Sequence, residues 1–390
     1  MVLKVTDLTG ILRNHYKNCD LVVEKLPRRS VAFNTWDRHN AYPTIEKLRE
    51  ELIDKAPDSV YYSTARYLEP SANAGPGKAS ETWAKKDRKS TDLTFDLDFD
   101  HVEGHGDMTY VEQIDTIAKH TLRLIDILEK QYGVNKYHIS FSGRRGFHVR
   151  VTDEAYIHLT KGQRKEIMRH LLGERLDMNA TLALYHTNPF SGDAGFKLKE
   201  PSLRDWGGKI RLACDSLMNN FDNSTVAFLE KHWPKKLTPK ELENLMSRFA
   251  NPTFRQRLIR TGDLRAFFGE KLATKTRLDN MYAMLLSMAK EMYAVEIDTS
   301  VTAEVNKIIR MPGSINSKHG YECRIIEKEE LMDMDYLFYN SAQTFGNKQV
   351  QVQIDKPMTV QGHRTFSLDS GIHTLPMHEA VLALCQSKLQ

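Results

Sequence analysis

The segment that decides the fold is LTFDLDFD, at residues 93–100. Apolar and polar side chains alternate along it with a period of two, which is typical of a β-strand with one buried face. The polar positions are Thr94, Asp96, Asp98 and Asp100. The carboxylates of Asp96 and Asp98 therefore leave the same face of the predicted strand, about 6–7 Å apart at the backbone.

A helix and a hairpin are predicted directly after this strand. Apolar residues keep a helical spacing through residues 110–132, and Gly133 is suited to end the helix. Alternation resumes at 137–142 and again at 147–151, on either side of GRRG at 143–146. Two alternating runs joined by a short glycine-bounded loop predict a β-hairpin.

The rest of the chain predicts a helical middle followed by further strands. Residues 154–292 are mostly helical in pattern and rich in Lys and Arg. Alternation returns at 294–298, a short helix is expected near 302–310, and a Pro-Gly turn leads to a strand at 321–327. We expect an α+β chain in which strands from both sides of a helical insert share one sheet. The predicted domains are 1–155 and 293–390, which form one module, and the insert at 156–292.

Composition excludes several classes of protein. The chain of 390 residues is 41% hydrophobic and 27% charged, as expected of a folded protein, and its net charge of +4 shows no global basicity. Any contact with a polyanion must therefore come from local patches. The four cysteines form no C-x-x-C pair and are widely separated, at Cys19, Cys214, Cys323 and Cys385. This spacing excludes a local thiolate zinc motif, and the absence of an apolar run of about 18 residues predicts a soluble, intracellular protein.

The paired aspartates of the first strand suggest a metal site. Hard oxygen ligands that converge from one strand suit Mg²⁺ or Mn²⁺. Asp298, at the end of another alternating run, is placed to complete a two-metal site that activates a hydroxyl and neutralises a pyrophosphate leaving group. The alternative is that Asp96 and Asp98 lie on the solvated face of an amphipathic strand. A D-x-D pair also occurs in sugar-nucleotide transferases.

Basic and polar groups gather in the hairpin and in a later turn. Guanidinium, hydroxyl and imidazole groups are suitable donors to a triphosphate, and the hairpin supplies Ser142, Arg144, Arg145 and His148. Arg310 and Lys318 flank a second tight turn. The alternatives are an ordinary solvated loop for the arginines and a structural role for His148. No G-x-x-x-x-G-K-[ST] sequence is present, which disfavours a P-loop ATPase, and no G-x-S-x-G sequence suggests acyl transfer.

Taken in order, these motifs resemble those of the archaeo-eukaryotic primase superfamily, and above all those of the archaeal DNA primase catalytic (small) subunit. The matching segments are DLDFD at 96–100, SGRRGFH at 142–148, EID ending at Asp298, and IIRMPGSINSKHG ending at Gly320. Further similarity lies in YYSTARY at 61–67 and in LPMHEAVLALC at 375–385. The resemblance covers most of the chain, and it is loosest in the middle.

The resemblance implies a primase fold, with a mixed-sheet catalytic module that contains an RRM-like element and carries a helical insert. It also implies template-directed synthesis of short primers from nucleoside triphosphates, with Mg²⁺ or Mn²⁺ held by Asp96, Asp98 and Asp298. The nucleotide-binding residues that it implies are Ser142, Arg144, Arg145, His148, Lys318, Arg310 and Arg38. The implied partners are a single-stranded DNA template and a large regulatory subunit. The expected location is cytoplasmic, at the nucleoid or replication fork, with no membrane contact.

Three departures from the family pattern stand out. His101 and His105 occupy the stretch where relatives often carry a zinc knuckle, and with no cysteine there we expect a solvated loop and no structural zinc; the alternative is that the two histidines ligate a metal. Asn316 stands where relatives usually have His, which puts one phosphate contact in doubt. The acidic residue of the family's R-E-F-x-F segment is absent from residues 27–33.

The sequence is also compatible with other functions. A repair-type primase-polymerase of the same superfamily would share every motif. A non-catalytic nucleic-acid-binding subunit would use the basic middle of the chain, although it would have no need for clustered carboxylates. A sugar-nucleotide glycosyltransferase is the poorest fit, because SGRRGFH has no role in it that we can state.

Overall fold

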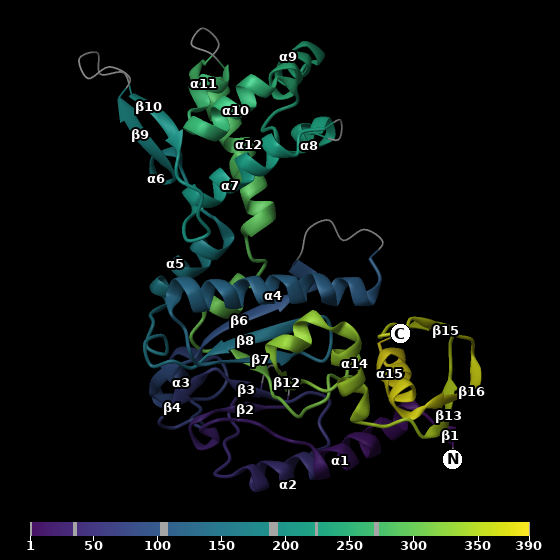
Figure 1. Ribbon diagram of the computed structural model, residues 1–390. Helices are drawn as coiled ribbons and strands as arrows, with labels where there is room; N and C mark the ends of the chain where they lie inside the picture. The colour runs from purple at the N-terminus through teal and green to yellow at the C-terminus, as the bar shows by residue number, and fades with distance from the viewer. Residues whose placement is uncertain are drawn as a thin grey trace. The chain divides into compact units, whose positions relative to one another are not determined.

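The computed structural model describes residues 2–33, 37–101, 108–186, 194–222, 225–268 and 273–389. The chain forms two compact units (Figure 1). The first is built from two separate segments, Met1–Met168 and Glu296–Gln390, and the second is Arg169–Val295. No helix in the described ranges is long and apolar enough to span a membrane.

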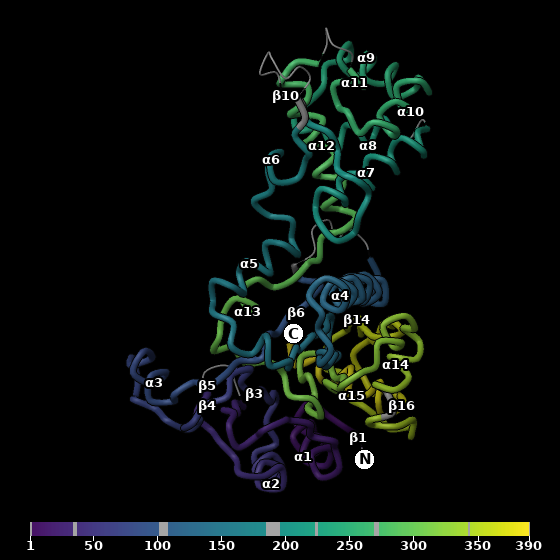
Figure 2. Tube along the Cα trace, turned by 60° about the vertical axis from the view of Figure 1, so that its left-hand side comes forward, coloured from purple at the N-terminus to yellow at the C-terminus, as the bar shows by residue number. Residues whose placement is uncertain are grey.

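The first unit is organised around a four-stranded antiparallel sheet in the order β12-β7-β8-β6. Its strands are β6 (Leu93–Asp98), β7 (Tyr137–Phe141), β8 (Gly146–Val151) and β12 (Arg324–Ile326). The predicted first strand and hairpin are therefore confirmed, and the strand expected at 321–327 is shortened to β12. The long helix α4 (Tyr110–Tyr132) packs against β6 and β8 (Figures 1 and 2).

The sequence of α4 explains its ends. Thr109 and Glu112 form a reciprocal capping box at its start, and Gly133 ends it with a positive φ of 67°. The apolar stripe of the helix is buried, and so is the apolar face of the sheet. This face consists of Leu93, Phe95, Leu97, Ile139, Phe141, Phe147, Val149 and Val151. The opposite face of the sheet carries the polar side chains, among them those of Thr94, Asp96, Asp98, Ser140, His148 and Arg150.

A second sheet supports the first from the N-terminal part of the chain. Its order is β11-β3-β2, with β2 (Val31–Ala32), β3 (Tyr61–Ser63) and β11 (Ile308–Arg310). It shares a buried core with α1 (Leu8–Asn18) and α2 (Ile45–Lys55). The adjoining elements are β4 (Ala65–Tyr67), α3 (Ala79–Lys86) and β5 (Arg88–Thr91).

Two sequence expectations near residue 300 are wrong. Residues 294–298 do not form a strand; they run without regular structure into the short helix α13 (Thr299–Ala303). The helix expected near 302–310 ends at Ala303, and β11 occupies 308–310. The alternation at 294–298 instead reflects burial, since Val295 and Ile297 are buried without joining a sheet. α13 packs beside β6 (Figure 2).

The C-terminal part of the first unit forms a third sheet with the N-terminal strand. Its order is β1-β13-β16, where β1 (Val2–Leu3) pairs in parallel with β13 (Gln349–Ile354) and β16 (Gly371–Pro376) runs antiparallel to it. The remaining elements are α14 (Met334–Gln343), β14 (Met358–Val360), β15 (Phe366–Leu368) and α15 (Met377–Ser387).

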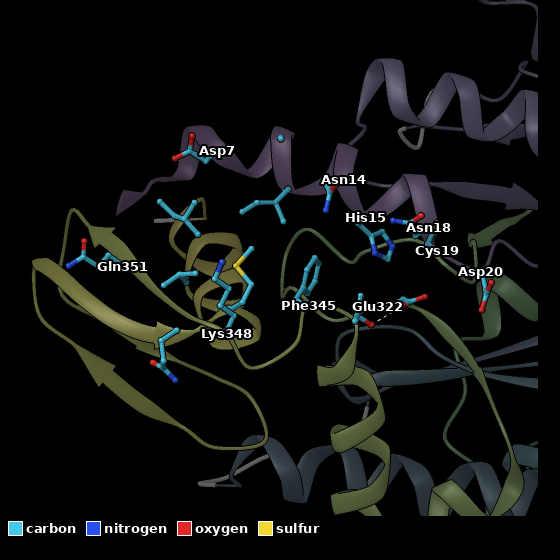
Figure 3. A pocket seen from close by; sticks show the side chains of 17 residues that line it. Asp7, Asn14, His15, Asn18, Cys19, Asp20, Glu322, Phe345, Lys348 and Gln351 are labelled. Carbon is cyan, nitrogen blue, oxygen red and sulfur yellow. Dashed lines mark hydrogen bonds between the residues drawn. The ribbon is translucent and has the colours of Figure 1, made fainter. Parts of the chain in front are cut away.

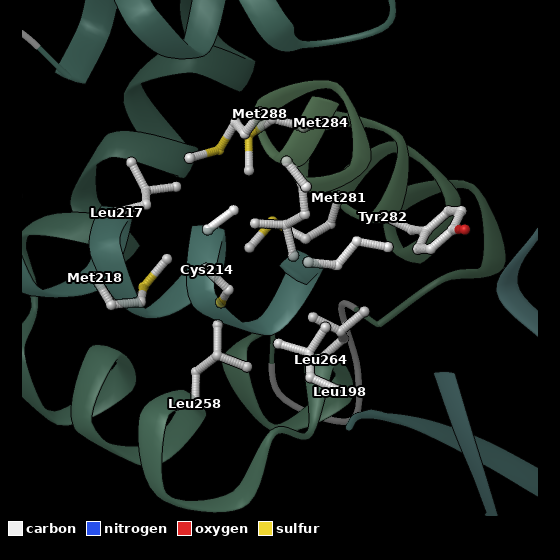
Figure 4. Close-up of a cluster of buried hydrophobic side chains, with 14 of the residues drawn as sticks. Leu198, Cys214, Leu217, Met218, Leu258, Leu264, Met281, Tyr282, Met284 and Met288 are labelled. Atoms are coloured by element: carbon white, nitrogen blue, oxygen red, sulfur yellow. The ribbon is translucent and has the colours of Figure 1, made fainter. Parts of the chain in front are cut away.

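The second unit has a core of its own. Helices α7 (Trp206–Asn219) and α12 (Lys275–Tyr293) pack together, and their Cys214, Met281 and Met284 are fully buried (Figure 4). The other elements are α6 (Met178–Thr181), β9 (Leu182–His186), β10 (Ala194–Leu198), α8 (Thr225–His232), α9 (Pro239–Ala250), α10 (Pro252–Thr261) and α11 (Leu264–Phe268). Helix α5 (Lys161–Leu172) leads into this unit.

Candidate active site

The polar face of the four-stranded sheet brings the aspartate strand and the hairpin together. β6 and β8 are direct neighbours, with Asp96 opposite His148 and Asp98 opposite Gly146. The His148 Nε2 atom lies 3.6 Å from Asp96 Oδ1. Because side chains alternate along a strand, Asp96 and Asp98 both project from the face that α4 does not cover. The two motifs thus meet through strand pairing.

A main-chain hydrogen bond places Asp298 beside the strand that carries Asp96 and Asp98. Its amide donates to the carbonyl of Asp96 at 2.7 Å. Its carboxylate caps α13, because Asp298 Oδ1 accepts from the amide of Ser300 at 2.7 Å and from that of Val301 at 3.4 Å. The third predicted carboxylate is therefore a helix cap beside β6.

The three carboxylates influence one another. Burial, together with the negative charges of Asp98 and Asp298, raises the pKa of Asp96 to about 7, and the charge of Lys307 opposes this rise. Such crowding of like charges is costly unless a cation is present. Lys307 has no place among the sequence predictions, because nothing in its local pattern indicates that it faces the carboxylates.

The carboxylates suit a hard divalent ion. Among the residues that the structure describes, no three His, Cys, Asp or Glu side chains already converge closely enough to hold an ion. The chemistry of the donors nevertheless fits Mg²⁺ or Mn²⁺, because Asp96, Asp98 and Asp298 offer oxygen ligands whose mutual repulsion a cation would relieve. All four cysteines are buried and separate. The side chain of His101 and all of His105 lie outside the described residues.

The hairpin offers polar atoms that lack partners. Ser142 Oγ, Arg145 Nε and His148 Nδ1 are buried and form no hydrogen bond. The hairpin is closed by the amide of Ser142, which donates to the carbonyl of Gly146 at 2.9 Å. Burial and, to a smaller extent, the charge of Arg310 lower the pKa of His148 to about 4, so the imidazole is neutral at physiological pH.

The two arginines of the hairpin share one carboxylate. Asp100 lies 3.3 Å from Arg144 Nη1 and also pairs with Arg145 Nη2. Asp100 is half exposed, and so an anionic ligand can compete with it for both guanidinium groups. The alternating pattern includes Asp100, but it did not indicate this pairing, because Asp100 follows the end of β6 in a 3₁₀ turn.

The other predicted nucleotide-binding residues have different surroundings. Arg310 is buried, with Nη1 donating to Ser59 Oγ at 3.3 Å and Nη2 donating to the hydroxyl of Tyr61 at 3.2 Å. Lys318 is exposed, and its ammonium has no hydrogen-bond or ion-pair partner in the described part of the chain. The carbonyl of Arg38 accepts from Lys86 Nζ at 2.7 Å.

Asn316 links the turn between Arg310 and Lys318 to the hairpin by hydrogen bonds. Its Nδ2 atom donates to the carbonyl of Ser142 at 3.1 Å, and its Oδ1 atom accepts from the amide of Lys318 at 3.2 Å. Both ends of the amide are therefore used within the protein. Asn316 holds the scaffold of the site.

A stack of aromatic rings supports the hairpin loop that carries Arg144 and Arg145. The sequence did not indicate this stack. The ring of His319 stacks on Tyr110 at a centroid distance of 4.6 Å, and on Tyr321 at 5.5 Å. The hydroxyl of Tyr110 donates to the carbonyl of Arg144. His319 is 5% exposed, and its Nε2 atom has no hydrogen-bond partner.

A buried charge network lies behind the carboxylates on the same polar face. Asp92 is fully buried and pairs with three guanidinium groups: Arg29 and Arg66, each at 2.7 Å, and Arg150 at 3.1 Å. Arg150 also reaches Glu24 at 3.2 Å. Arg150 is two residues from His148 on β8, so this network fixes the strand that carries the histidine.

A large cavity elsewhere in the first unit does not mark this site. It has a volume of about 1020 Å³ and lies between α1 and β13 (Figure 3). His15, Glu322 and Lys348 contribute to its lining, and none of the predicted catalytic or nucleotide-binding residues does.

Comparison with known proteins supplies the context for this geometry. The family described as DNA primase small subunit matches residues 95–327. The DNA primase small subunit PriS of Methanococcoides burtonii is 26% identical over 382 residues, which cover 93% of this chain and 92% of that protein. The corresponding protein of Methanothrix thermoacetophila is 29% identical and covers 90% and 87%, and that of Haloarcula marismortui is 27% identical and covers 98% and 97%. A solved polymerase domain of Mycobacterium tuberculosis ligase D in complex with DNA overlaps with a TM-score of only 0.27 at 14% identity, which is too low to define the fold.

Proposed function

This chain belongs to the DNA primase small subunit family, and on that premise we propose that it makes primers by two-metal nucleotidyl transfer at Asp96, Asp98 and Asp298. It is the catalytic subunit of a primase, a nucleotidyltransferase that synthesises RNA primers on a DNA template. The observation that carries the proposal is that Asp298 is hydrogen-bonded to the backbone of Asp96, on the strand that also carries Asp98, beside a hairpin whose buried polar atoms lack partners.

The carboxylates of Asp96, Asp98 and Asp298 would hold the Mg²⁺ or Mn²⁺ ions. Bound there, the ions would lower the pKa of the attacking 3′-hydroxyl and neutralise charge on the leaving pyrophosphate. In the reaction, a bond forms between this 3′-oxygen and the α-phosphorus of the incoming nucleotide, and the bond from that phosphorus to the bridging oxygen breaks. The proton of the hydroxyl is released, and pyrophosphate leaves.

The hairpin residues bind the triphosphate in this proposal. Arg144 and Arg145 exchange Asp100 for phosphate oxygens, since guanidinium groups match phosphate geometry. Ser142 and His148 donate from the partnerless atoms described above. Lys318, with its unpaired ammonium, completes the cradle.

In this proposal Arg310 acts on the nucleotide indirectly, through His148, and Arg38 contacts the nucleotide itself. Arg310 is held by hydrogen bonds to Ser59 and Tyr61, and its charge adds to the effect of burial in lowering the pKa of His148, which keeps the imidazole neutral. Arg38 reaches the nucleotide from the loop whose carbonyl Lys86 holds.

We also propose how the chain is divided into domains and which partners it binds. Residues 1–155 and 293–390 form the catalytic module, with the β6–β8 region as its RRM-like element, and 156–292 form a helical insert. The partners are a single-stranded DNA template, nucleoside triphosphates and a large regulatory subunit, and the place of action is the replication fork in the cytoplasm.

The test is synthesis on an unprimed template. Purified protein is incubated with single-stranded DNA, labelled nucleoside triphosphates and Mg²⁺ or Mn²⁺, next to a variant carrying Asp96→Ala and Asp98→Ala. We expect short products from the wild type and none from the variant. Absence of products from the wild type, or equal products from both proteins, would reject the proposal. A gapped duplex offered in parallel would reveal a repair-type enzyme, which extends it in preference to starting new chains.

A further inference from the structure

Lys307 lies in a loop whose backbone is pinned from several sides. The loop connects α13 to β11. The carbonyl of Lys307 accepts from the amide of Thr64 at 2.9 Å and from its hydroxyl at 3.1 Å. The carbonyl of Val305 accepts from the hydroxyl of Thr91 at 3.1 Å. The side-chain Oδ1 of Asn306 accepts from the hydroxyl of Tyr67 at 3.2 Å. The backbone at Lys307 is therefore held in place by hydrogen bonds, whereas its side chain is held by few contacts.

The ammonium group of Lys307 is held loosely. Its one hydrogen-bond partner among the described residues is Ser300 Oγ, at 3.4 Å, and it forms no ion pair with them. The side chain is half-buried. A partly buried cation without an anionic partner is unusual, because burial of a charge is unfavourable unless an opposite charge compensates it.

The compensating charge is the carboxylate cluster. The amide of Ser300 donates to Asp298 Oδ1 at 2.7 Å, and the amide of Asp298 donates to the carbonyl of Asp96 at 2.7 Å. Lys307 thus stands next to the cluster, close enough that its charge opposes the effect of Asp98 and Asp298 on Asp96. Within the described part of the chain, Lys307 forms no ion pair with any of the three aspartates, and its ammonium approaches Asp298 only through Ser300.

We propose that Lys307 is a further active-site residue: its ammonium balances the aspartate cluster before ions bind, and turns to a phosphate oxygen of the bound substrates afterwards. The inference rests on the proposed function. Two divalent ions would add four positive charges to a cluster that carries three negative charges at most, and Lys307 would then be repelled from it. Because the backbone is pinned, the side chain alone responds. A phosphate oxygen of the incoming triphosphate or of the nucleic acid is the anion that arrives with the ions.

The experiment compares three variants of the full chain with the wild type. Lys307→Gln removes the charge, and Lys307→Arg keeps it. Lys161→Gln removes a charge of the same sign that contacts Glu304 in the same loop, and it serves as the matched control. Mn²⁺ binding is measured by calorimetry at low ionic strength without nucleotide, since salt screens such effects. We expect Lys307→Gln to bind Mn²⁺ about 10-fold more tightly than the wild type, because the competing charge is gone.

The second measurement locates the phosphate. With Mn²⁺ present, we expect Lys307→Gln to weaken substrate binding about 10-fold, while Lys307→Arg and Lys161→Gln stay within about twofold of the wild type. A rise in the KM for nucleoside triphosphate with unchanged DNA affinity assigns the contact to the triphosphate. A weaker DNA affinity with unchanged KM assigns it to the nucleic acid. If neither quantity changes, the phosphate contact is wrong.

The metal titration also separates this inference from the proposed function. If the wild type binds no Mn²⁺, or binds it equally after Asp96→Asn, the proposed function fails and this inference fails with it. If the wild type binds Mn²⁺ through Asp96 and Lys307→Gln binds it with the same affinity, only the role of Lys307 is overturned.

Discussion

The amide of Asp298 donates a hydrogen bond to the carbonyl of Asp96 at 2.7 Å, although the whole Arg169–Val295 unit separates the two residues in the sequence. This bond joins the two chain segments from which the first unit is built. It fixes the relative position of two carboxylates through the backbone, whose geometry does not depend on a bound ion. Folding therefore brings the carboxylates together even without a bound ion. Repulsion between their charges then lowers the stability of the folded protein.

This cost predicts opposite effects of Asp96→Asn on stability and on activity. Without divalent ions at pH 8, the change removes one of three crowded charges, and we expect the free energy of unfolding to rise by about 1–3 kcal/mol. Primer synthesis should fall by about 1000-fold or more, because an amide is a poor ligand for Mg²⁺. Chemical denaturation in the presence of a chelator and the unprimed-template assay measure the two effects. A variant that is both less stable and fully active would contradict the cluster.

A second prediction concerns the buried network around Asp92. Asp92→Asn leaves Arg29, Arg66 and Arg150 without their shared counter-charge in a fully buried position. We expect the free energy of unfolding to fall by about 3–5 kcal/mol, as is typical when one partner of a buried ion pair is lost. Lys47→Ala is the control, because it breaks only the exposed pair with Glu50 and should change stability by less than about 1 kcal/mol. Urea denaturation of both variants is the measurement.

The sequence was sufficient for the central strands because their signals are local. Alternation identified β6 and the hairpin, and the helical spacing together with Gly133 identified α4. Each of these patterns depends on neighbours within a few residues. The chemistry of the aspartate strand could be interpreted in the same way, because period two places Asp96 and Asp98 on one face whatever the rest of the chain does.

The sequence was insufficient where distant segments decide the structure. The run at 294–298 alternates as a strand does, but no strand pairs with it, and the carboxylate of Asp298 caps α13 instead. The charge of Lys307 matters only because the fold places its loop beside α13. Likewise, no local pattern indicates that His319 stacks on Tyr110, which belongs to a helix far earlier in the chain. Long-range packing fixes all three features.

A third prediction uses the stack at His319 to set a pH dependence. Burial, together with the charges of Arg144 and Arg145, lowers the pKa of His319 to about 3, whereas a histidine in an unfolded chain has a pKa near 6.5. The native state therefore binds fewer protons than the unfolded state between these values. The stability that the neutral ring contributes is complete above pH 6.5 and is lost progressively as the pH falls toward 3, by about 1.4 kcal/mol per pH unit.

His319→Phe keeps an aromatic ring between Tyr110 and Tyr321 and removes the proton site. We expect its stability at pH 7.5 to remain within about 1.5 kcal/mol of the wild type, as for a swap of similar volume. Between pH 6.5 and 4.5, the free energy of unfolding of the variant should fall less steeply with decreasing pH than that of the wild type. The difference in slope should correspond to the uptake of about one proton. Urea denaturation at four pH values tests this, and parallel slopes for the two proteins would show that His319 does not titrate in this range.

The last prediction concerns the glycine that lets the hairpin approach the aspartate strand. Gly146 faces Asp98 across the β6–β8 pair, and a Cβ atom at this position would lie 2.2 Å from the carbonyl oxygen of Leu97 and 3.0 Å from the Cα of Asp98. Backbone atoms are unable to yield as a flexible side chain would. Gly146→Ala must therefore separate the strands at the point where the carboxylate and the arginine turn meet.

We expect Gly146→Ala to lower the free energy of unfolding by about 1–3 kcal/mol through overpacking. Primer synthesis should fall by about 100-fold, since a displacement of about 1 Å between reacting groups has effects of this size. Gly10→Ala is the matched control: a Cβ at Gly10 meets no atom within 4 Å, and the change lies within α1, so it should stabilise the protein by about 0.5–1 kcal/mol with no change in synthesis. Full activity in Gly146→Ala would mean that the spacing between β6 and β8 does not matter for catalysis, and the assignment of the hairpin as the triphosphate site would then have to be abandoned.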